Sequence, residues 1–180
     1  PAGDVGVLPT ASGVPESSGP LTVGDFELHG AEDRTELINV TFPNREIADD
    51  QAIADKIREK ELVFFTGGDQ ARIIRAFRPD SGDTAGYQAL WDVLDRKGTI
   101  AGTSAGAAMM SDPCVRWGSS NEALLAGFSN VPDRGVRVAR GMGFFPYGLT
   151  GQHFIERGRL GRLIVALEWA EEDFGFGVAE

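Results

Sequence analysis

Short apolar segments, each followed directly by a turn, constrain this chain more than any other feature of its sequence. Leu62–Phe65 is wholly apolar and runs into Thr-Gly-Gly-Asp-Gln, and Thr99–Ala101 runs into Gly-Thr-Ser-Ala-Gly. Val5–Leu8 is followed in the same way by the loop Pro9–Gly13, and amphipathic segments such as Asp49–Lys60 lie between the runs. Apolar strands that alternate with helices are typical of a parallel sheet covered on both faces.

The remaining segments extend this pattern. We predict a second strand at Thr35–Phe42 and a final strand at Phe174–Ala179. Helices are predicted around Ile73 to Phe77, around Leu90 to Leu94 and, late in the chain, at Leu160–Ala170. A weakly helical segment contains Leu21, Phe26 and Leu28, and Asp112–Gly143 is interpreted as loops with a small edge of sheet. We therefore predict one α/β domain over residues 1–180, a three-layer sandwich with a mostly parallel central sheet.

Net charge excludes one broad class of function. The chain of 180 residues has a formal net charge of -10, and its sequence has no stripe of lysine and arginine with which to neutralise nucleic-acid phosphates, which argues against general nucleic-acid binding. A cationic or zwitterionic substrate suits this charge better, and improved solubility is the alternative explanation.

Cysteine usage and hydropathy set further bounds. Cys114 is the single cysteine, which excludes an internal disulfide and a cysteine-rich metal site, and we expect it to be a small buried filler. No apolar run has the roughly 18 residues that a membrane-spanning helix needs. The chain begins at Pro1 without methionine, so the localisation stays open; the cytoplasm is favoured and a secreted form is the alternative.

The segment Gly102-Thr103-Ser104-Ala105-Gly106 has the pattern of a nucleophile elbow. A strand precedes it and small residues that favour a helix follow it, so the serine is expected on a tight turn where bulky neighbours would clash. Backbone N–H groups at the start of the helix favour a developing oxyanion. The alternative is a Gly/Ala-rich turn used only for close packing.

A serine nucleophile needs a base, and the chain offers two histidines. His29 lies in a turn-like surface stretch and is interpreted as structural. His153 lies in a glycine-flanked loop before the late helix, and we predict it as the base. A carboxylate is then needed to orient the imidazole, and Glu180 follows the last strand; sequence alone prefers it little over Glu171 or its acidic neighbours.

Two further groups of residues complete the predicted site. Gly67 and Gly68 can supply a backbone N–H that joins that of Ala105 in an oxyanion hole, with a simple tight turn as the alternative. Arg157, Arg159 and Arg162 follow His153 closely, and guanidinium groups match carboxylates bidentately, so the cluster is a candidate for binding substrate carboxylates. The alternative is that these arginines form a solvated helix face or an internal ion pair.

These motifs, in this order, resemble the cyanophycinase group of serine peptidases, relatives of dipeptidase E that share a fold like the class I glutamine amidotransferases. The resemblance spans most of the chain. It rests on Phe65-Thr66-Gly67-Gly68-Asp69-Gln70, on Gly102 to Ala107, on Gln152-His153-Phe154 with the arginine cluster, and on Gly175 to Glu180; Pro9 to Gly13 also matches the first strand-end loop.

The resemblance implies a flavodoxin-like fold and a Ser104, His153 and Glu180 triad. It also implies a substrate pocket lined by Asp69, Gln70, Gln152, Arg157, Arg159 and Arg162. The activity implied is exo-acting hydrolysis of cyanophycin, a polyaspartate chain with arginine on each side chain, to β-aspartyl-arginine dipeptides. No metal or other cofactor is required, and the expected partner is a peptide or polymer, not a nucleic acid or a membrane. A homodimer is an open alternative to a monomer.

The chain departs from the family pattern at several points. Gly151 stands where the family usually has aspartate, so one carboxylate that contacts positive substrate groups is missing. The family's glycine-rich start is absent and Glu180 is the last residue, which suggests a form trimmed at both ends. Two rivals follow: a dipeptidase acting on aspartyl or isoaspartyl peptides, and an inactive relative that binds peptides without cutting them.

Overall fold

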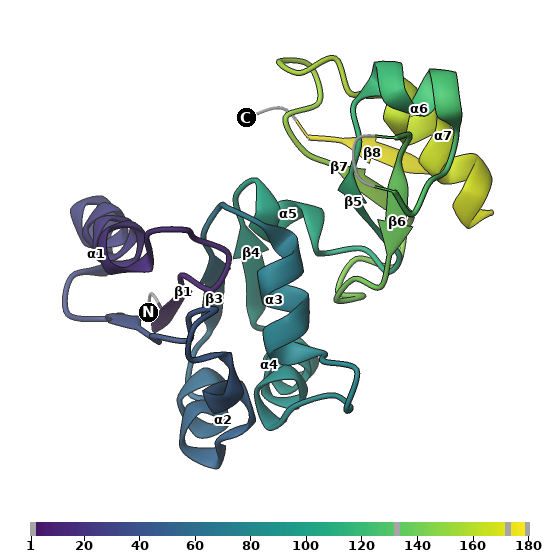
Figure 1. Cartoon of the computed structure of the whole chain (residues 1–180). Helices are drawn as coiled ribbons and strands as arrows, with labels where there is room; N and C mark the ends of the chain where they lie inside the picture. Colours follow the sequence, from purple (N-terminus) through teal and green to yellow (C-terminus); the bar gives the residue numbers. More distant parts are fainter. Residues whose placement is uncertain (1–2, 132–133, 172–173, 179–180) are drawn as a thin grey trace. The chain divides into compact units, whose positions relative to one another are not determined.

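The computed structural model describes residues 3–131, 134–171 and 174–178. Its contacts divide the chain into two compact units, Pro1–Gly106 and Ala107–Glu180 (Figure 1). Among the described residues, no helix is long and apolar enough to cross a membrane. The predicted class, α/β with a parallel central sheet, is confirmed.

The first unit is built around a four-stranded parallel sheet in the order β2-β1-β3-β4. Its strands are β1 (Val5–Leu8), β2 (Thr35–Leu37), β3 (Leu62–Phe65) and β4 (Thr99–Gly102). Leu8 pairs with Phe65 and Phe65 pairs with Gly102, so β1, β3 and β4 end side by side at one edge of the sheet. The loops that follow these strands therefore meet at that edge.

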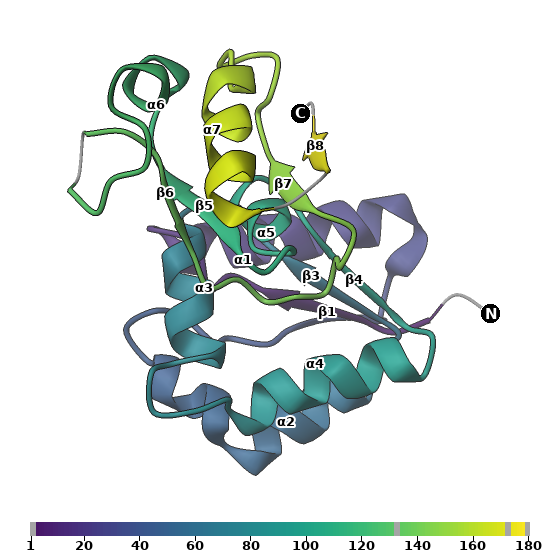
Figure 2. The same ribbon diagram turned by 90° about the vertical axis from the view of Figure 1, so that its right-hand side faces the viewer.

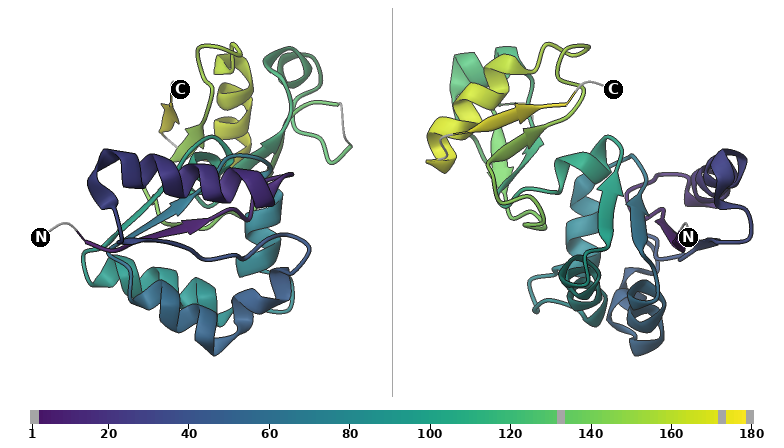
Figure 3. Two further views of the ribbon diagram at one scale, coloured as in Figure 1. Left: turned by 90° about the vertical axis from the view of Figure 1, so that its left-hand side faces the viewer. Right: turned by 180° about the vertical axis from the view of Figure 1, so that it is seen from behind.

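Helices cover both faces of this sheet. Figures 2 and 3 show α1 (Pro15–Phe26) on one side of the strands and α2 (Gln51–Arg58) and α4 (Ala85–Asp95) on the other. Successive residues of β3 explain why the whole strand is apolar: the ring of Phe64 packs edge-on against Phe26, and Phe65 packs edge-on against Phe77 of α3 (Gln70–Phe77). The remaining short helical turns are Glu27–Ala31 and Arg45–Asp49.

The second unit contains two two-stranded sheets. Strands β5 (Cys114–Trp117) and β6 (Arg137–Ala139) are antiparallel, and β7 (Leu149–Gly151) and β8 (Gly175–Gly177) are parallel. Helices α6 (Ser120–Ala126) and α7 (Leu160–Ala170) pack together, and α7 also contacts β6, β7 and β8 (Figure 2). Helix α5 (Ala105–Ala108) spans the boundary between the two units.

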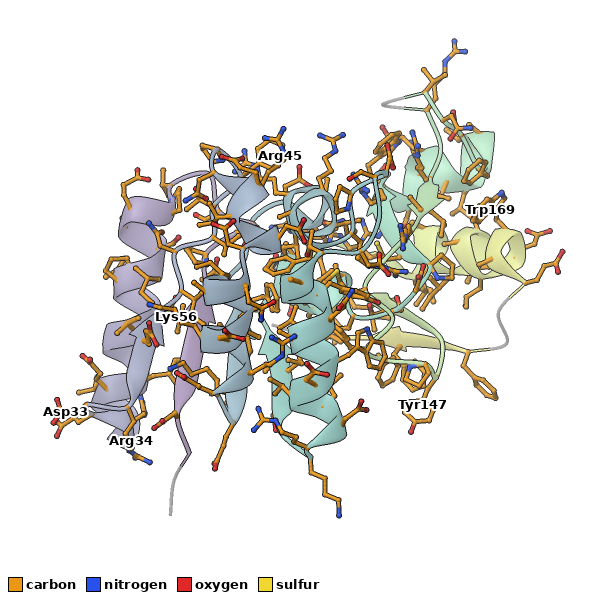
Figure 4. All side chains as sticks on the ribbon, turned by 90° about the horizontal axis from the view of Figure 1, so that it is seen from below. Asp33, Arg34, Arg45, Lys56, Tyr147 and Trp169 are labelled. Atoms are coloured by element: carbon orange, nitrogen blue, oxygen red, sulfur yellow. The ribbon has the colours of Figure 1, made fainter. Side chains whose placement is uncertain are left out.

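A small apolar core lies inside the second unit. Its buried members come from β5, α6, β6, β7, α7 and the residue before β6: Val115, Ala123, Val136, Val138, Leu149, Leu163 and Ala166. Trp169 of α7, labelled in Figure 4, stacks on Phe128 at a ring-centroid distance of 4.3 Å. These contacts hold α7 over strands that are only three or four residues long.

The structure corrects the prediction at two places. The second strand was expected over Thr35–Phe42 but ends at Leu37, because the Val40 N–H donates to the Ile38 carbonyl at 2.7 Å and bends the chain. Asp112–Gly143 was expected to be loops with a small edge of sheet; that sheet is present as β5 and β6, but helix α6 was not predicted. The loop that carries the predicted base also begins with a strand, β7.

Candidate active site

Ser104 lies on a strained turn between β4 and α5. Its φ of 50° is in the left-handed region, which residues other than glycine rarely adopt, and its side chain is half-buried. Gly102 and Gly106 permit the tight turn: a Cβ on Gly102 would lie 2.7 Å from the Gly106 carbonyl carbon, and one on Gly106 would lie 2.5 Å from the Phe65 carbonyl oxygen. Strain of this kind at a polar side chain is typical of functional sites.

The turn after β3 lies beside this serine. A Cβ on Gly67 would be 3.3 Å from the Ser104 Cβ, and the Thr103 N–H donates to the Phe65 carbonyl at 3.2 Å. Gly68 has a φ of 142°, and a Cβ there would overlap the Ala11 carbonyl oxygen. The structure therefore brings the predicted Gly67 and Ser104 together through close main-chain packing.

Asp69 and Gln70 begin helix α3. The Asp69 carboxylate accepts a hydrogen bond from the Ala71 N–H at 2.8 Å, and the Asp69 N–H donates to the Ala11 carbonyl at 2.9 Å. Asp69 is thus an N-cap residue, a role that Asp fills well because its side chain satisfies a free helix N–H. Gln70 is buried as the first residue of the helix. For both residues the predicted contact with substrate stays a prediction.

His153 lies in the second unit, two residues after the end of strand β7. Its φ is 47°, a second left-handed residue among the predicted catalytic groups. Two main-chain hydrogen bonds to Val178 fix the surrounding chain: the Val178 N–H donates to the Gly151 carbonyl at 2.8 Å, and the Val178 carbonyl accepts from the Phe154 N–H at 3.1 Å. The residue after β8 therefore brackets the histidine.

Glu180 lies outside the described residues. Val178, the last described residue, precedes it by two positions in the sequence. The carboxylate assigned to the triad thus follows the segment that brackets His153.

The predicted arginines belong to the same part of the second unit. Arg159 donates through Nη1 to the Gln152 carbonyl at 2.8 Å and also to the Gln152 side-chain oxygen. Arg162 is buried and donates to the Gly118 carbonyl at 3.1 Å. Burial lowers the pKa of Arg162 to about 10, and the positive charges of Arg159 and Arg157 add to this effect. Arg157 is exposed.

Two buried hydroxyl groups were not predicted from the sequence. Ser111 and Thr150 hydrogen-bond to each other, and the Thr150 hydroxyl also donates to the Ala107 and Ala108 carbonyls at the end of α5. The sequence does hint that these hydroxyl groups are buried, because Ser111 follows the apolar Met110 and Thr150 follows the apolar Leu149. Polar residues at buried positions generally have a hydrogen-bonding role.

Comparison with known proteins identifies relatives along the whole chain. The chain is 32% identical over 177 residues to a cyanophycinase of Synechococcus elongatus, with 98% of this chain and 51% of the relative covered. Cyanophycinases of Trichormus variabilis and Geminocystis herdmanii are also 32% identical, covering 97% and 98% of this chain and 54% and 60% of the relatives. The chain thus spans little more than half the length of these relatives. A scan against models of protein families gives no match.

Solved structures agree at the level of the fold. A peptidase from an acI-B1 Actinobacterium superposes with a TM-score of 0.66 at 18% identity, covering 98% of this chain and 67% of that one. A putative peptidase E protein from Listeria monocytogenes gives a TM-score of 0.60 at 17% identity, covering 99% and 78%. The chain is therefore a homologue of the cyanophycinases over nearly its whole length, and its fold is that of the peptidase E-like proteins.

Proposed function

We propose that this chain is a serine-type peptidase of cyanophycinase type, which hydrolyses cyanophycin to β-aspartyl-arginine dipeptides. Ser104 is the nucleophile and His153 is the general base in this proposal. Glu180 is the carboxylate that orients the imidazole. The observation that carries it is the left-handed φ of Ser104, held between glycines that no larger residue can replace.

The chemistry follows the acyl-enzyme route. The Ser104 oxygen forms a bond to the carbonyl carbon of the scissile amide while its proton passes to His153. The C–N bond then breaks as the imidazolium returns that proton to the leaving amine. Water, deprotonated by the same imidazole, then attacks the ester; the bond from the acyl carbon to the Ser104 oxygen breaks, the imidazolium returns its proton to that oxygen, and the acid product is released. Main-chain N–H groups of Gly67, Gly68 and Ala105 are the proposed donors to the oxyanion.

Substrate recognition is assigned to the polar residues around His153 and to the start of α3. The Arg157, Arg159 and Arg162 group carries positive charge next to the base, which suits substrate carboxylates. Gln152 is held by Arg159 and presents an amide at the same place. The net charge of -10 favours a substrate that also carries guanidinium groups, as cyanophycin does. Asp69 and Gln70 complete the proposed pocket.

A second candidate is an aspartyl or isoaspartyl dipeptidase. Gly151 favours it, because the cyanophycinase pattern has a carboxylate there that contacts positive groups of the substrate. Incubation of the protein with cyanophycin and, separately, with β-aspartyl dipeptides separates the two candidates when the products are resolved by chromatography. Release of β-aspartyl-arginine from the polymer supports the first proposal, and cleavage of dipeptides alone supports the second.

The Ser104→Ala variant tests the nucleophile. We expect its kcat to fall at least about a thousandfold, because no other group in the proposal forms the acyl-enzyme. Its Tm should stay within about 2 °C of the parent, since only one hydroxyl is removed from a half-buried position. Labelling of the parent, but not the variant, by a fluorophosphonate would exclude an inactive peptide-binding relative. Retained turnover in Ser104→Ala overturns the assignment.

A further inference from the structure

A closed set of hydrogen bonds links the end of helix α5 to strand β7. The Ser111 and Thr150 hydroxyl oxygens lie 3.3 Å apart, and the Thr150 N–H donates to the Ser111 Oγ at 3.2 Å. The Thr150 hydroxyl donates to the carbonyl oxygens of Ala107 at 3.2 Å and Ala108 at 3.3 Å. Both side chains are buried: Ser111 is 2% exposed and Thr150 is 7% exposed.

The geometry of strand β7 explains why a hydroxyl is needed there. Main-chain groups of alternate residues point to opposite edges of a strand. The Leu149 N–H and the Gly151 carbonyl are bonded to the β8 segment, at Phe174 and Val178. The Thr150 N–H faces the other edge, and there the Ser111 Oγ takes the place of a neighbouring strand. Without that oxygen a buried N–H would lose its partner.

Each proton in the set has one consistent place. Ser111 Oγ accepts the Thr150 N–H and donates its own proton to Thr150 Oγ1. Thr150 Oγ1 in turn donates to the Ala107 and Ala108 carbonyls at the end of α5, and the Ala107 carbonyl also accepts from the Met110 N–H. Both hydroxyls are used as donor and as acceptor, so the set works as a unit.

The two ends of this set lie close in sequence to the proposed catalytic residues. Ala107 is one helical turn after Ser104, and Thr150 precedes His153 by three positions. We propose that Ser111 and Thr150 are positioning residues, which fix strand β7 against the end of α5 and so set the placement of His153 for reaction with Ser104. This inference rests on the proposed function, and neither hydroxyl touches the reacting atoms in it.

Packing alone would not favour two hydroxyls here. Valine has nearly the shape of threonine, and an apolar pair avoids the cost of burying polar groups. Hydroxyls add direction, because their bonds are satisfied only at one register of β7 against α5. Catalysis is sensitive to such register, since a misplacement of about 1 Å can lower a rate about a hundredfold.

Kinetics of three variants test the proposal on the substrate that the parent cleaves. Thr150→Val should lower kcat about 10- to 100-fold with KM within about threefold, whereas Thr150→Ser, which keeps the hydroxyl, should recover most of kcat. Thr84→Val is the matched control. Thr84 is also buried, and its hydroxyl donates to the Phe77 carbonyl and accepts from the Tyr87 N–H. These three residues are distant in the sequence from Ser104 and His153. The kcat of Thr84→Val should be unchanged.

Ser111→Ala and the double variant extend the test. Because the hydroxyls act as a unit, Ser111→Ala should resemble Thr150→Val, and the double variant should lose no more than about twofold beyond either single variant. Should Thr150→Val not fold, Ser111→Ala and Thr150→Ser provide the comparison. A folded variant that lacks either hydroxyl and keeps kcat within twofold overturns the proposal, as does an equal loss in Thr84→Val.

Hydrogen exchange separates this inference from the proposed function. A peptide covering residues 149–154 should exchange about tenfold faster or more in Thr150→Val than in the parent, and Thr150→Ser should restore protection. This measurement needs no turnover. If the parent cleaves neither substrate and takes up no fluorophosphonate, the proposed function fails; unchanged exchange in Thr150→Val means that the hydroxyls do not hold β7.

Discussion

The two units differ in how much their functional turns depend on side-chain hydrogen bonds. In the first unit, the loops after β1 and β3 are joined by main-chain bonds, such as those from Thr66 to Leu8 and from Asp69 to Ala11. In the second unit, side chains add to the main-chain bonds around His153: Ser120 donates to the Gly158 carbonyl at 2.5 Å, and Asp112 accepts from the Gly141 N–H at 3.0 Å. Glycine substitutions and polar substitutions should therefore damage the two units differently.

This difference explains which kind of residue each unit depends on. Main-chain packing requires that side chains be absent, so the first unit depends on glycine where strands and loops meet. Side-chain bonding requires specific hydroxyls, amides and guanidinium groups, each of which contributes about 1 kcal/mol of net stability. The nucleophile's turn therefore depends mainly on steric fit, whereas the loop of the proposed base depends on polar side chains as well as on main-chain bonds.

Gly68→Ala should have the largest effect. The new Cβ would overlap the Ala11 carbonyl oxygen at a φ of 142°, so backbone strain and overpacking add. We expect a loss of roughly 3–6 kcal/mol in the free energy of unfolding, measured by urea denaturation. Gly82→Ala is the control, because its φ is 133° but no atom lies within 4 Å of the new Cβ; it should cost about 1–3 kcal/mol. Equal losses would show that contact with Ala11 is irrelevant.

Gly148→Ala makes the same change in the second unit. Its φ is 135°, and a Cβ there would overlap the Phe174 carbonyl oxygen, next to the bond that joins β7 to the β8 segment. Hydrogen exchange on both variants tests the prediction of a single domain over residues 1–180. Loss of protection throughout the chain in each variant supports one cooperative domain, and loss confined to the altered unit contradicts it.

Sequence patterns predicted the first unit more closely than the second. β1 and β3 have the predicted ends, Val5–Leu8 and Leu62–Phe65, because strands buried on both faces leave continuous apolar runs between turn residues. β8 lies within the predicted strand Phe174–Ala179, but β7 is only three residues long and ends in glycine, so no apolar run marks it. Their pairing is a contact between residues distant in the sequence, which a local pattern does not record.

The same contrast holds for the candidate site. Glycines flank Ser104 in the sequence, so the tight turn was predictable, and its left-handed φ fits that prediction. The capping role of Asp69 and the hydrogen bond from Arg159 to Gln152 were not predictable, because each depends on side-chain direction. Residue type indicated polar function at these positions, but the partner of each polar group is fixed only by the folded chain.

Cys114→Ala should have a smaller effect on stability, and its pH dependence tests whether water is excluded from the interior around β5. The thiol is fully buried in β5, and burial raises its pKa to about 12 from the ordinary 9.0. The unfolded chain loses the proton near pH 9 while the folded chain keeps it, so this group makes stability fall as pH rises from 9 to 12. Between pH 8 and pH 10 the parent should lose about 1.4 kcal/mol more than Cys114→Ala in urea denaturation.

Alkylation provides the control for that measurement. Iodoacetamide at pH 8 should modify the parent only after denaturant is added, because the reactive thiolate forms to a negligible extent in the folded chain. Rapid modification without denaturant, or identical pH dependence in parent and Cys114→Ala, would contradict a dry environment around β5.

Ser119→Ala should have the smallest effect, and it addresses the helix that the sequence analysis missed. Ser119 and Glu122 form a capping box at the start of α6, with the Ser119 N–H donating to the Glu122 carboxylate at 2.6 Å and the Glu122 N–H donating to the Ser119 Oγ at 3.2 Å. Removing the hydroxyl should cost about 1 kcal/mol in urea denaturation, and Ser119→Thr should recover most of it. An unchanged stability in Ser119→Ala would mean that packing of α6 on α7, rather than its cap, determines where the helix begins.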